Sequence, residues 1–121
     1  MTEKMYPQVV DVHALVGRYP GGRYREHSPT SAEALRDDVI IPALQQHGSV
    51  VIKCDGDQVI MGSSWLEELL GGILRNEHYK HITQRSEFDK LVILNFNPET
   101  DDLARANDII DAQLKRNTAN G

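Results

Sequence analysis

The stretch Val50–Leu74, VVIKCDGDQVIMGSSWLEELLGGIL, decides the fold. It opens with an apolar run, Val50–Ile52, that is typical of a buried strand. An acidic turn at 55–57 separates this run from Gly62-Ser63-Ser64, after which an amphipathic helix is predicted to extend to about Glu77. The order of strand, turn, paired serines and helix places two hydroxyls at the positive end of a helix dipole, where backbone N–H groups lack intrahelical partners.

The predicted helix has one apolar face and an unusual pair of glycines. Gly71-Gly72 lies inside it and costs about 1 kcal/mol per glycine relative to alanine. Such a pair predicts close approach to another backbone, and the chain's own sheet is a more natural neighbour than a partner. The core-facing positions fall at helical spacing: Leu66, Leu69, Leu70, Ile73 and Leu74.

The N-terminal third is predicted to form a hairpin and then a helix. Loose alternation over Val9–Val16 predicts a first strand, and Arg23–Arg25 is expected to return as a short second strand. A helix is predicted over Ser31–Gln46, with Thr30 and Glu33 as a capping box. Gly48 is its expected stop, and a kink is expected at Pro42 because proline lacks an N–H.

The C-terminal third adds one more strand and one more helix. The apolar run Leu91–Phe96 is typical of a strand covered on both faces. Asn97-Pro98 resembles a helix start, the helix is expected to end near Lys115, and the remaining residues are expected to fray. The alternation predicts a single α/β domain over residues 1–121 with an ordered core at about 7–116. Its sheet is expected to be small and mixed or parallel, with an N-terminal β-hairpin and three to four packing helices.

Composition narrows the function classes. The chain has 121 residues and a net charge of −5, which argues against a nucleic-acid partner. No apolar stretch approaches the ~20 residues that cross a bilayer, so no membrane partner is expected. The N-terminus lacks the order of a signal peptide, and one cysteine suits a reducing compartment. We therefore expect a cytoplasmic protein, in which Cys54 is an inert core thiol.

Three stretches together resemble the STAS-like domains of bacterial proteins, a family of unknown function related to anti-sigma-factor antagonists. They are Pro20–Tyr24, the helix around Ser31–Leu44 with its proline, and the tract Val50–Leu74. The resemblance covers roughly Val9–Asn97 and implies a STAS-like fold. In antagonists, a histidine-kinase-like ATPase phosphorylates a serine at the start of the helix after the central strand.

By position, the resemblance makes Ser63 the phosphoacceptor and Ser64 the serine that follows it. The antagonists usually read Asp-Ser-Ser-Gly, whereas this chain has Gly62 and Trp65 at the flanking positions. A second interpretation needs no phosphate, because Ser64 and Glu67 form a capping box that explains Ser64 completely. Capping alone and a regulatory site are equally compatible with the residues.

The absence of a base or activator near the serines favours a non-enzymatic domain of bacterial signalling that binds a protein. Association of two copies of the chain stays open, and no cofactor or metal is expected. Trp65 is either an exposed interface anchor or peripheral core, the latter being somewhat favoured. The expected partner surface surrounds Ser63 and Ser64 and comprises Asp57, Gln58, Met61, Gly62 and Trp65.

Two alternative functions use other chemistry. In the first, the helix start at Ser63-Ser64 binds a small anion or a nucleotide, with Arg23 as the counter-charge. The second is a hydrolase or metal enzyme that uses the acidic turn, Asp55 and Asp57, or the histidines His78 and His81. It is the least supported, because Asp-Gly-Asp is an ordinary turn and no third ligand accompanies the histidines.

Overall fold

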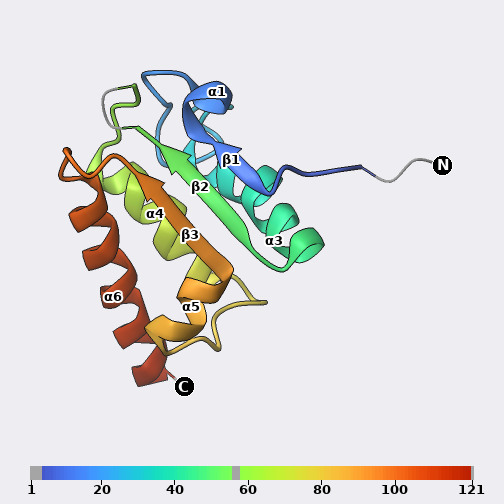
Figure 1. The fold of residues 1–121 in the computed structure, drawn as a ribbon, viewed down its shortest axis with the longest axis vertical. Coiled ribbons are helices and arrows are strands. Elements are labelled where there is room, and N and C mark those ends of the chain that lie inside the picture. The colour runs from blue at the N-terminus through green and yellow to red at the C-terminus, as the bar shows by residue number, and fades with distance from the viewer. Residues whose placement is uncertain (1–3, 56–57, 121) are drawn as a thin grey trace.

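Three parallel strands form one small sheet in the computed structural model, which describes residues 4–55 and 58–120. The central strand, β2 (Val50–Cys54), lies between β1 (Val9–Asp11) and β3 (Val92–Phe96) (Figure 1). The register pairs Val51 with Val9 on one side and with Ile93 on the other. The predicted α/β class and the strand at 50–54 are therefore confirmed.

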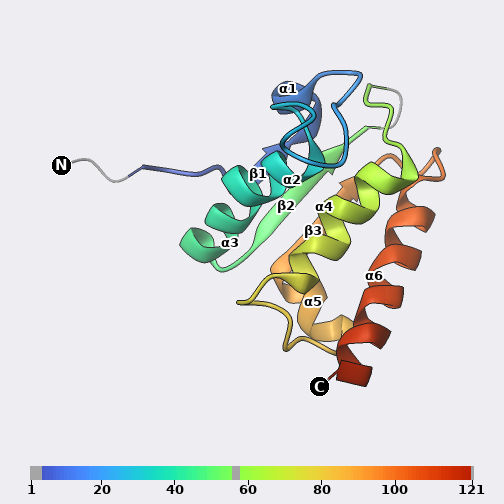
Figure 2. The same cartoon turned by 180° about the vertical axis from the view of Figure 1, so that it is seen from behind.

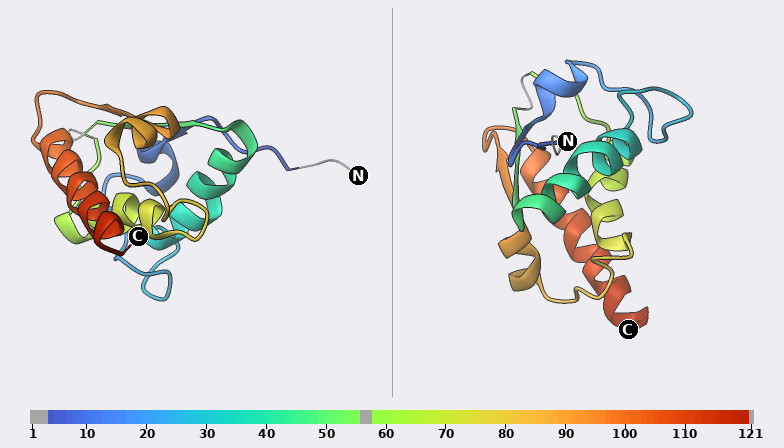
Figure 3. Two further views of the ribbon diagram at one scale, coloured as in Figure 1. Left: turned by 90° about the horizontal axis from the view of Figure 1, so that it is seen from below. Right: turned by 90° about the vertical axis from the view of Figure 1, so that its right-hand side faces the viewer.

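The main helices cover one face of the sheet. Because successive strands step in one direction across the sheet and such crossovers are right-handed, every crossover helix falls on the same side. Figures 2 and 3 show α2, α3, α4 and α6 together on that side. The helical segments are α1 (Val12–Val16), α2 (Ala32–Leu35), the π-helix η1 (Arg36–Ile40), α3 (Ile41–His47), α4 (Ser63–Arg75), α5 (Arg85–Leu91) and α6 (Asp102–Asn120).

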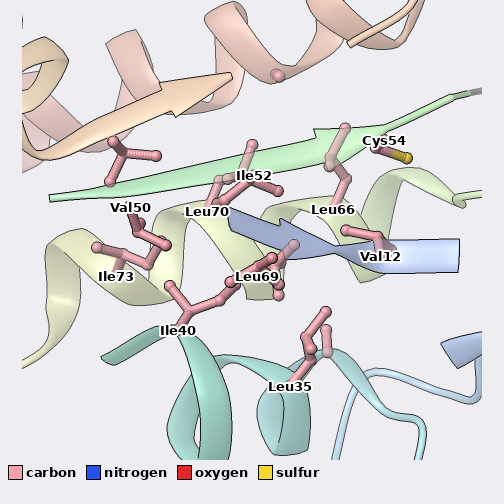
Figure 4. Packing of buried hydrophobic residues seen from close by; sticks show 14 of the residues in the cluster. Val12, Leu35, Ile40, Val50, Ile52, Cys54, Leu66, Leu69, Leu70 and Ile73 are labelled. Atoms are coloured by element: carbon pink, nitrogen blue, oxygen red, sulfur yellow. The ribbon is translucent and has the colours of Figure 1, made fainter. Parts of the chain in front are cut away.

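The hydrophobic core lies between the sheet and these helices. Alternate residues of β2, including Val50 and Ile52, point toward α4 and are completely buried (Figure 4). The predicted apolar stripe of α4 is confirmed, because all five of its members are fully buried: Leu66, Leu69, Leu70, Ile73 and Leu74. This packing fixes α4 against the sheet and therefore fixes the position of its first residue.

On the opposite face of the sheet, no helix of residues 4–55 and 58–120 packs. Val9 and Ile93 are each about half exposed on this face, and Val51 between them is half-buried. The prediction that Leu91–Phe96 is covered on both faces is therefore wrong. The physical reason is the unidirectional strand order, which leaves no crossover to cover the second face.

The predicted N-terminal hairpin is also wrong. β1 ends at Asp11, whose carboxylate accepts a hydrogen bond from the Ala14 backbone N–H at 3.2 Å and caps α1. Val12 and Val16 are buried at helical spacing, so the apparent alternation was a helical pattern. Residues 23–25 form bends and a turn rather than a strand.

The predicted helix over 31–46 exists, but its details differ. Ser31, not Thr30, is the N-cap, and its side chain accepts from the Ala34 backbone N–H at 3.1 Å. The disturbance expected at Pro42 takes the form of the π-helix η1, a wider helical turn. It ends at Ile40, two residues before Pro42, whose nitrogen has no hydrogen to donate. Gly48 ends the helix with φ = 80°, as predicted.

The C-terminal region is more ordered than the sequence suggested. α5 was not predicted, and α6 begins at Asp102 rather than after Asn97-Pro98. It continues to Asn120 because the Asn117 amide is buried and donates to the backbone carbonyls of Leu74 and Ile82, both at 3.0 Å. The expected frayed tail is therefore wrong up to residue 120.

Within residues 4–55 and 58–120, no helix has both the length and the apolar character that a bilayer crossing requires.

Candidate functional site at the start of α4

The two serines occupy the first turn of α4. Gly62 is the N-cap, with extended backbone (φ = −71°, ψ = 159°), and its carbonyl accepts from the Leu66 backbone N–H at 3.0 Å. Ser63 is therefore the first helical residue and Ser64 the second, and both are exposed. The prediction that Ser64 caps the helix with Glu67 is wrong, because the N-cap is Gly62, two residues earlier, and no side chain caps the helix there.

An arginine from α6 reaches this helix start. Arg105 Nη1 donates to Ser63 Oγ at 3.2 Å, and Nη2 donates to the Met61 backbone carbonyl at 3.0 Å. The same guanidinium pairs with Asp102 and lies 3.7 Å from the carboxylate of Asp101 through Nε. Sequence reasoning missed Arg105, because only the long-range packing of α6 beside α4 brings it to Ser63, and no local pattern signals that packing.

The remaining residues of the expected partner surface divide by exposure. Gln58 and Gly62 are exposed, as that surface requires. Met61 and Trp65 are only 5% and 4% exposed, so they are core residues and not surface contacts. The Trp65 Nε1–H donates to the Thr30 carbonyl at 3.4 Å, which satisfies its polar atom inside the fold. Asp57 lies outside the described residues.

Two exposed apolar side chains belong to the loops that meet before the helix start. Ile60 is 52% exposed and Tyr19 is 73% exposed. The Ile60 backbone N–H donates to the Arg18 carbonyl at 2.8 Å, which joins the loop that carries Tyr19 to the loop that leads into α4. The segment that leads into α4 therefore exposes the Ile60 side chain as well as the serine hydroxyls.

Arg23 does not lie where the anion hypothesis placed it. Its Nε donates to Glu68 Oε1 at 3.0 Å and its Nη2 pairs with Glu67, on the face of α4 beyond the first turn. The hydrogen bond to Glu68 is the main cause that raises the pKa of Arg23. The role of Arg23 as counter-charge at Ser63 is therefore wrong, and Arg105 occupies that position.

The glycine pair of α4 makes room for charged side chains, not for a backbone. A Cβ at Gly72 would lie 2.8 Å from Arg36 Cζ, and one at Gly71 would meet the Glu67 carboxylate and lie 2.8 Å from Arg75 Nη1. Arg36 thereby reaches across α4 and pairs with Glu68. Burial alone would raise the pKa of Glu68, but hydrogen bonds from Arg36 and Arg23 outweigh it and hold this pKa below its usual value.

The other candidate residues show no converging chemistry. Cys54 is buried, so its predicted place in the core is confirmed, and burial raises the pKa of its thiol to about 12. Asp55 accepts a hydrogen bond from the Asn97 amide at 3.0 Å. His78 and His81 are exposed. In the part of the chain that the structure describes, no three His, Cys, Asp or Glu side chains are placed to hold a metal ion.

Comparisons of the chain with protein-family models, with curated proteins and with solved structures give no match. The resemblance to STAS-like domains therefore stays a prediction from the sequence, and the functional argument depends on the geometry around Ser63.

Proposed function

We propose that the chain is a STAS-like, non-enzymatic interaction domain that binds a protein at the start of α4 and is switched by phosphorylation of Ser63. The observation that carries the proposal is the exposed Ser63 hydroxyl on the first residue of α4, with the Arg105 guanidinium 3.2 Å away. α4 follows the central strand β2, which is the place that the resemblance gives to a phosphorylated serine.

The local charges favour a phosphate on Ser63. A phosphoserine carries about −1.5 to −2 charges at pH 7 and three acceptor oxygens. On Ser63 these oxygens would meet the unpaired N–H groups of the first helical turn and the guanidinium of Arg105. Asp102 pairs with that guanidinium in the unmodified chain, so the phosphate would compete with Asp102 for Arg105.

The surroundings of Ser63 support binding rather than catalysis. Among the described residues, Arg105 is the hydrogen-bond partner of the Ser63 hydroxyl, and a guanidinium stays protonated in proteins and cannot act as a general base. Within the described part of the chain, Ser63 thus has no neighbour that would activate it as a nucleophile. The exposed side chains of Ile60 and Tyr19 supply the apolar contacts that a partner protein would bury.

A phosphorylation assay tests the switch. The chain is incubated with ATP and a histidine-kinase-like ATPase encoded near it, and the phosphate is mapped by mass spectrometry. Ser64→Ala is the matched control, because Ser64 is equally exposed one residue further on. We expect phosphate on Ser63 in the wild-type chain and in Ser64→Ala, and none in Ser63→Ala. An unlabelled wild-type chain, or label that persists in Ser63→Ala, would remove Ser63 as the switch.

The contact surface is tested separately through Ile60. Replacing this exposed side chain by Asp adds a charge to the proposed interface without opening the core. We expect Ile60→Asp to weaken partner binding at least about tenfold, because loss of a hot-spot side chain at an interface centre costs about 2 kcal/mol or more and a tenfold change corresponds to about 1.4 kcal/mol. Ile93→Asp, on the helix-free face of the sheet, is the control. Equal losses in both variants would place the partner elsewhere.

A further inference from the structure

A second concave surface lies at the other end of α4. It is a groove of about 1100 Å³ between the loop at 23–24, the outer face of α4, the turn that follows α4 and the last turns of α6. We call it the α4–α6 groove. It shares no lining residue with the surface around Ser63, so its function can be argued independently of the phosphorylation proposal.

The residues that line the α4–α6 groove are of polar or charged types. Tyr24 is its one aromatic side chain, and no aliphatic side chain is among the described residues that line it. Pockets for apolar ligands are lined mainly by hydrophobic and aromatic side chains. The α4–α6 groove therefore suits a ligand that is itself polar and charged.

The charges of the groove favour an anion. Its cationic side chains outnumber its carboxylates, although the whole chain has a net charge of −5. Two of the carboxylates, Glu67 and Glu68, are already paired with arginines, and Arg36 reaches Glu68 from outside the groove lining. The cationic side chains that line the groove are Arg23, Arg75, Lys80 and Arg116.

Arg116 is held in place by a neutral group. Its Nε and Nη2 donate to Gln113 Oε1 at 3.2 and 3.0 Å. Gln113 is buried, and its amide is fixed by Arg75 Nη1 at 2.9 Å and by Asn117 at 3.0 Å. A guanidinium that is oriented by an amide instead of a carboxylate keeps its full charge for a ligand.

Lys80 adds a second uncompensated cation. Neither Lys80 nor Arg116 has a carboxylate partner within 4.0 Å among residues 4–55 and 58–120, although both line the same groove. The two side chains therefore add positive charge to the groove that no carboxylate of the described residues pairs with.

We propose that the α4–α6 groove binds a small ligand that carries two or more phosphate or carboxylate groups. Arg116 and Lys80 supply the main contacts, and Arg75 adds a donor from the floor. Guanidinium groups match phosphate and carboxylate oxygens equally well, so these two groups share the chemistry of the site. Tyr24 offers a ring on which an attached base could stack.

Isothermal titration with pyrophosphate, ATP and citrate at physiological salt tests the proposal and separates the ligand sources. We expect saturable 1:1 binding of at least one probe, with chemical-shift changes at the side chains of Gln113 and His81. Preference for ATP identifies a nucleotide, preference for pyrophosphate a phosphate ligand, and preference for citrate a polycarboxylate; each supports the proposal.

Paired substitutions make the test specific. Lys80→Gln with Arg116→Gln should weaken binding at least about tenfold, because each variant removes a charge-assisted hydrogen bond. Lys90→Gln with Lys115→Gln removes the same charge from exposed positions outside the groove and should bind as the wild type does. Lys80→Gln alone guards against misfolding, since Lys80 makes no ion pair in the described part of the chain. No saturable binding of any probe, or equal losses in the two double variants, would overturn the proposal.

Discussion

The substitution Gly72→Ala tests the arrangement of arginines over α4. Alanine stabilises a helix interior by about 1 kcal/mol relative to glycine, so helix propensity alone predicts a more stable protein. The structure predicts the opposite, because the new Cβ would lie 2.8 Å from Arg36 Cζ and 2.9 Å from Arg36 Cδ. Arg36 would have to leave α4, and its contacts with Glu68 would be lost.

The lost contacts outweigh the gain in propensity. Arg36 Nη1 donates to the Glu68 carbonyl at 2.8 Å and pairs with the Glu68 carboxylate. Both side chains are only 11% exposed, so solvent screens their interaction weakly. Losing one charged hydrogen bond costs about 1.5–3 kcal/mol. After the gain of about 1 kcal/mol from alanine, we expect Gly72→Ala to lower the free energy of unfolding by about 0.5–2 kcal/mol.

Urea unfolding followed by Trp65 fluorescence and circular dichroism measures this free energy. In an Arg36→Ala background the obstacle is absent, so Gly72→Ala should stabilise the protein by about 1 kcal/mol. Gly71→Ala is the matched control: its Cβ meets the flexible, partly exposed ends of Glu67 and Arg75, and the variant should be neutral or more stable. A stabilised Gly72→Ala protein, or the same loss in both backgrounds, would refute the reasoning.

Three further predictions concern buried side chains on α4, α6 and β2. The pKa of Glu68 is lower in the folded chain than its ordinary value of 4.5, so the ionised carboxylate stabilises the fold above about pH 4.5, and this stabilisation is lost as the pH falls through the folded pKa. The free energy of unfolding should therefore fall less steeply with acid in Glu68→Gln than in the wild type, and parallel pH profiles would contradict this. Asn117→Ala should lower the free energy of unfolding in urea by about 1–3 kcal/mol, because it leaves two buried carbonyls without the Asn117 amide, whereas Asn120→Ala at an exposed position should change it little. Equal effects of the two variants would contradict the proposed role of Asn117 in holding the end of α6. The Cys54 thiol, with its pKa raised to about 12, should resist iodoacetamide at pH 8 until urea unfolds the chain, and rapid labelling of the folded protein would show that it is accessible.

The elements predictable from sequence are those with a complete local pattern. β2 begins with three consecutive apolar residues, Val50–Ile52, and α4 has five apolar residues at helical spacing, so the pattern of each element indicates its type. The strand predicted over Val9–Val16 is confirmed only at Val9–Asp11, because the valines that follow fit the helical period as well and the Asp11 carboxylate caps a helix there. A local pattern therefore predicts the type of element only where the residues fit either the helical or the strand period and not both.

The candidate site was only partly predictable for a different reason. The exposed serine at the start of α4 follows from local sequence, but its arginine does not. Arg105 and Ser63 are 42 positions apart, and their contact depends on how α6 packs beside α4. Likewise, Gly71-Gly72 signalled a close neighbour correctly, yet nothing local shows that this neighbour is a guanidinium from η1.

The burial of α4 restricts how a switch at Ser63 could act. All five residues of its apolar stripe are fully buried against the sheet, so a large displacement of the helix would expose much of the core. A phosphate at the first residue, in contrast, adds charge to a surface that already contains Arg105 and the exposed side chain of Ile60. The fold therefore favours a switch that changes the charge of the contact surface and the partner of Arg105, with α4 remaining in place.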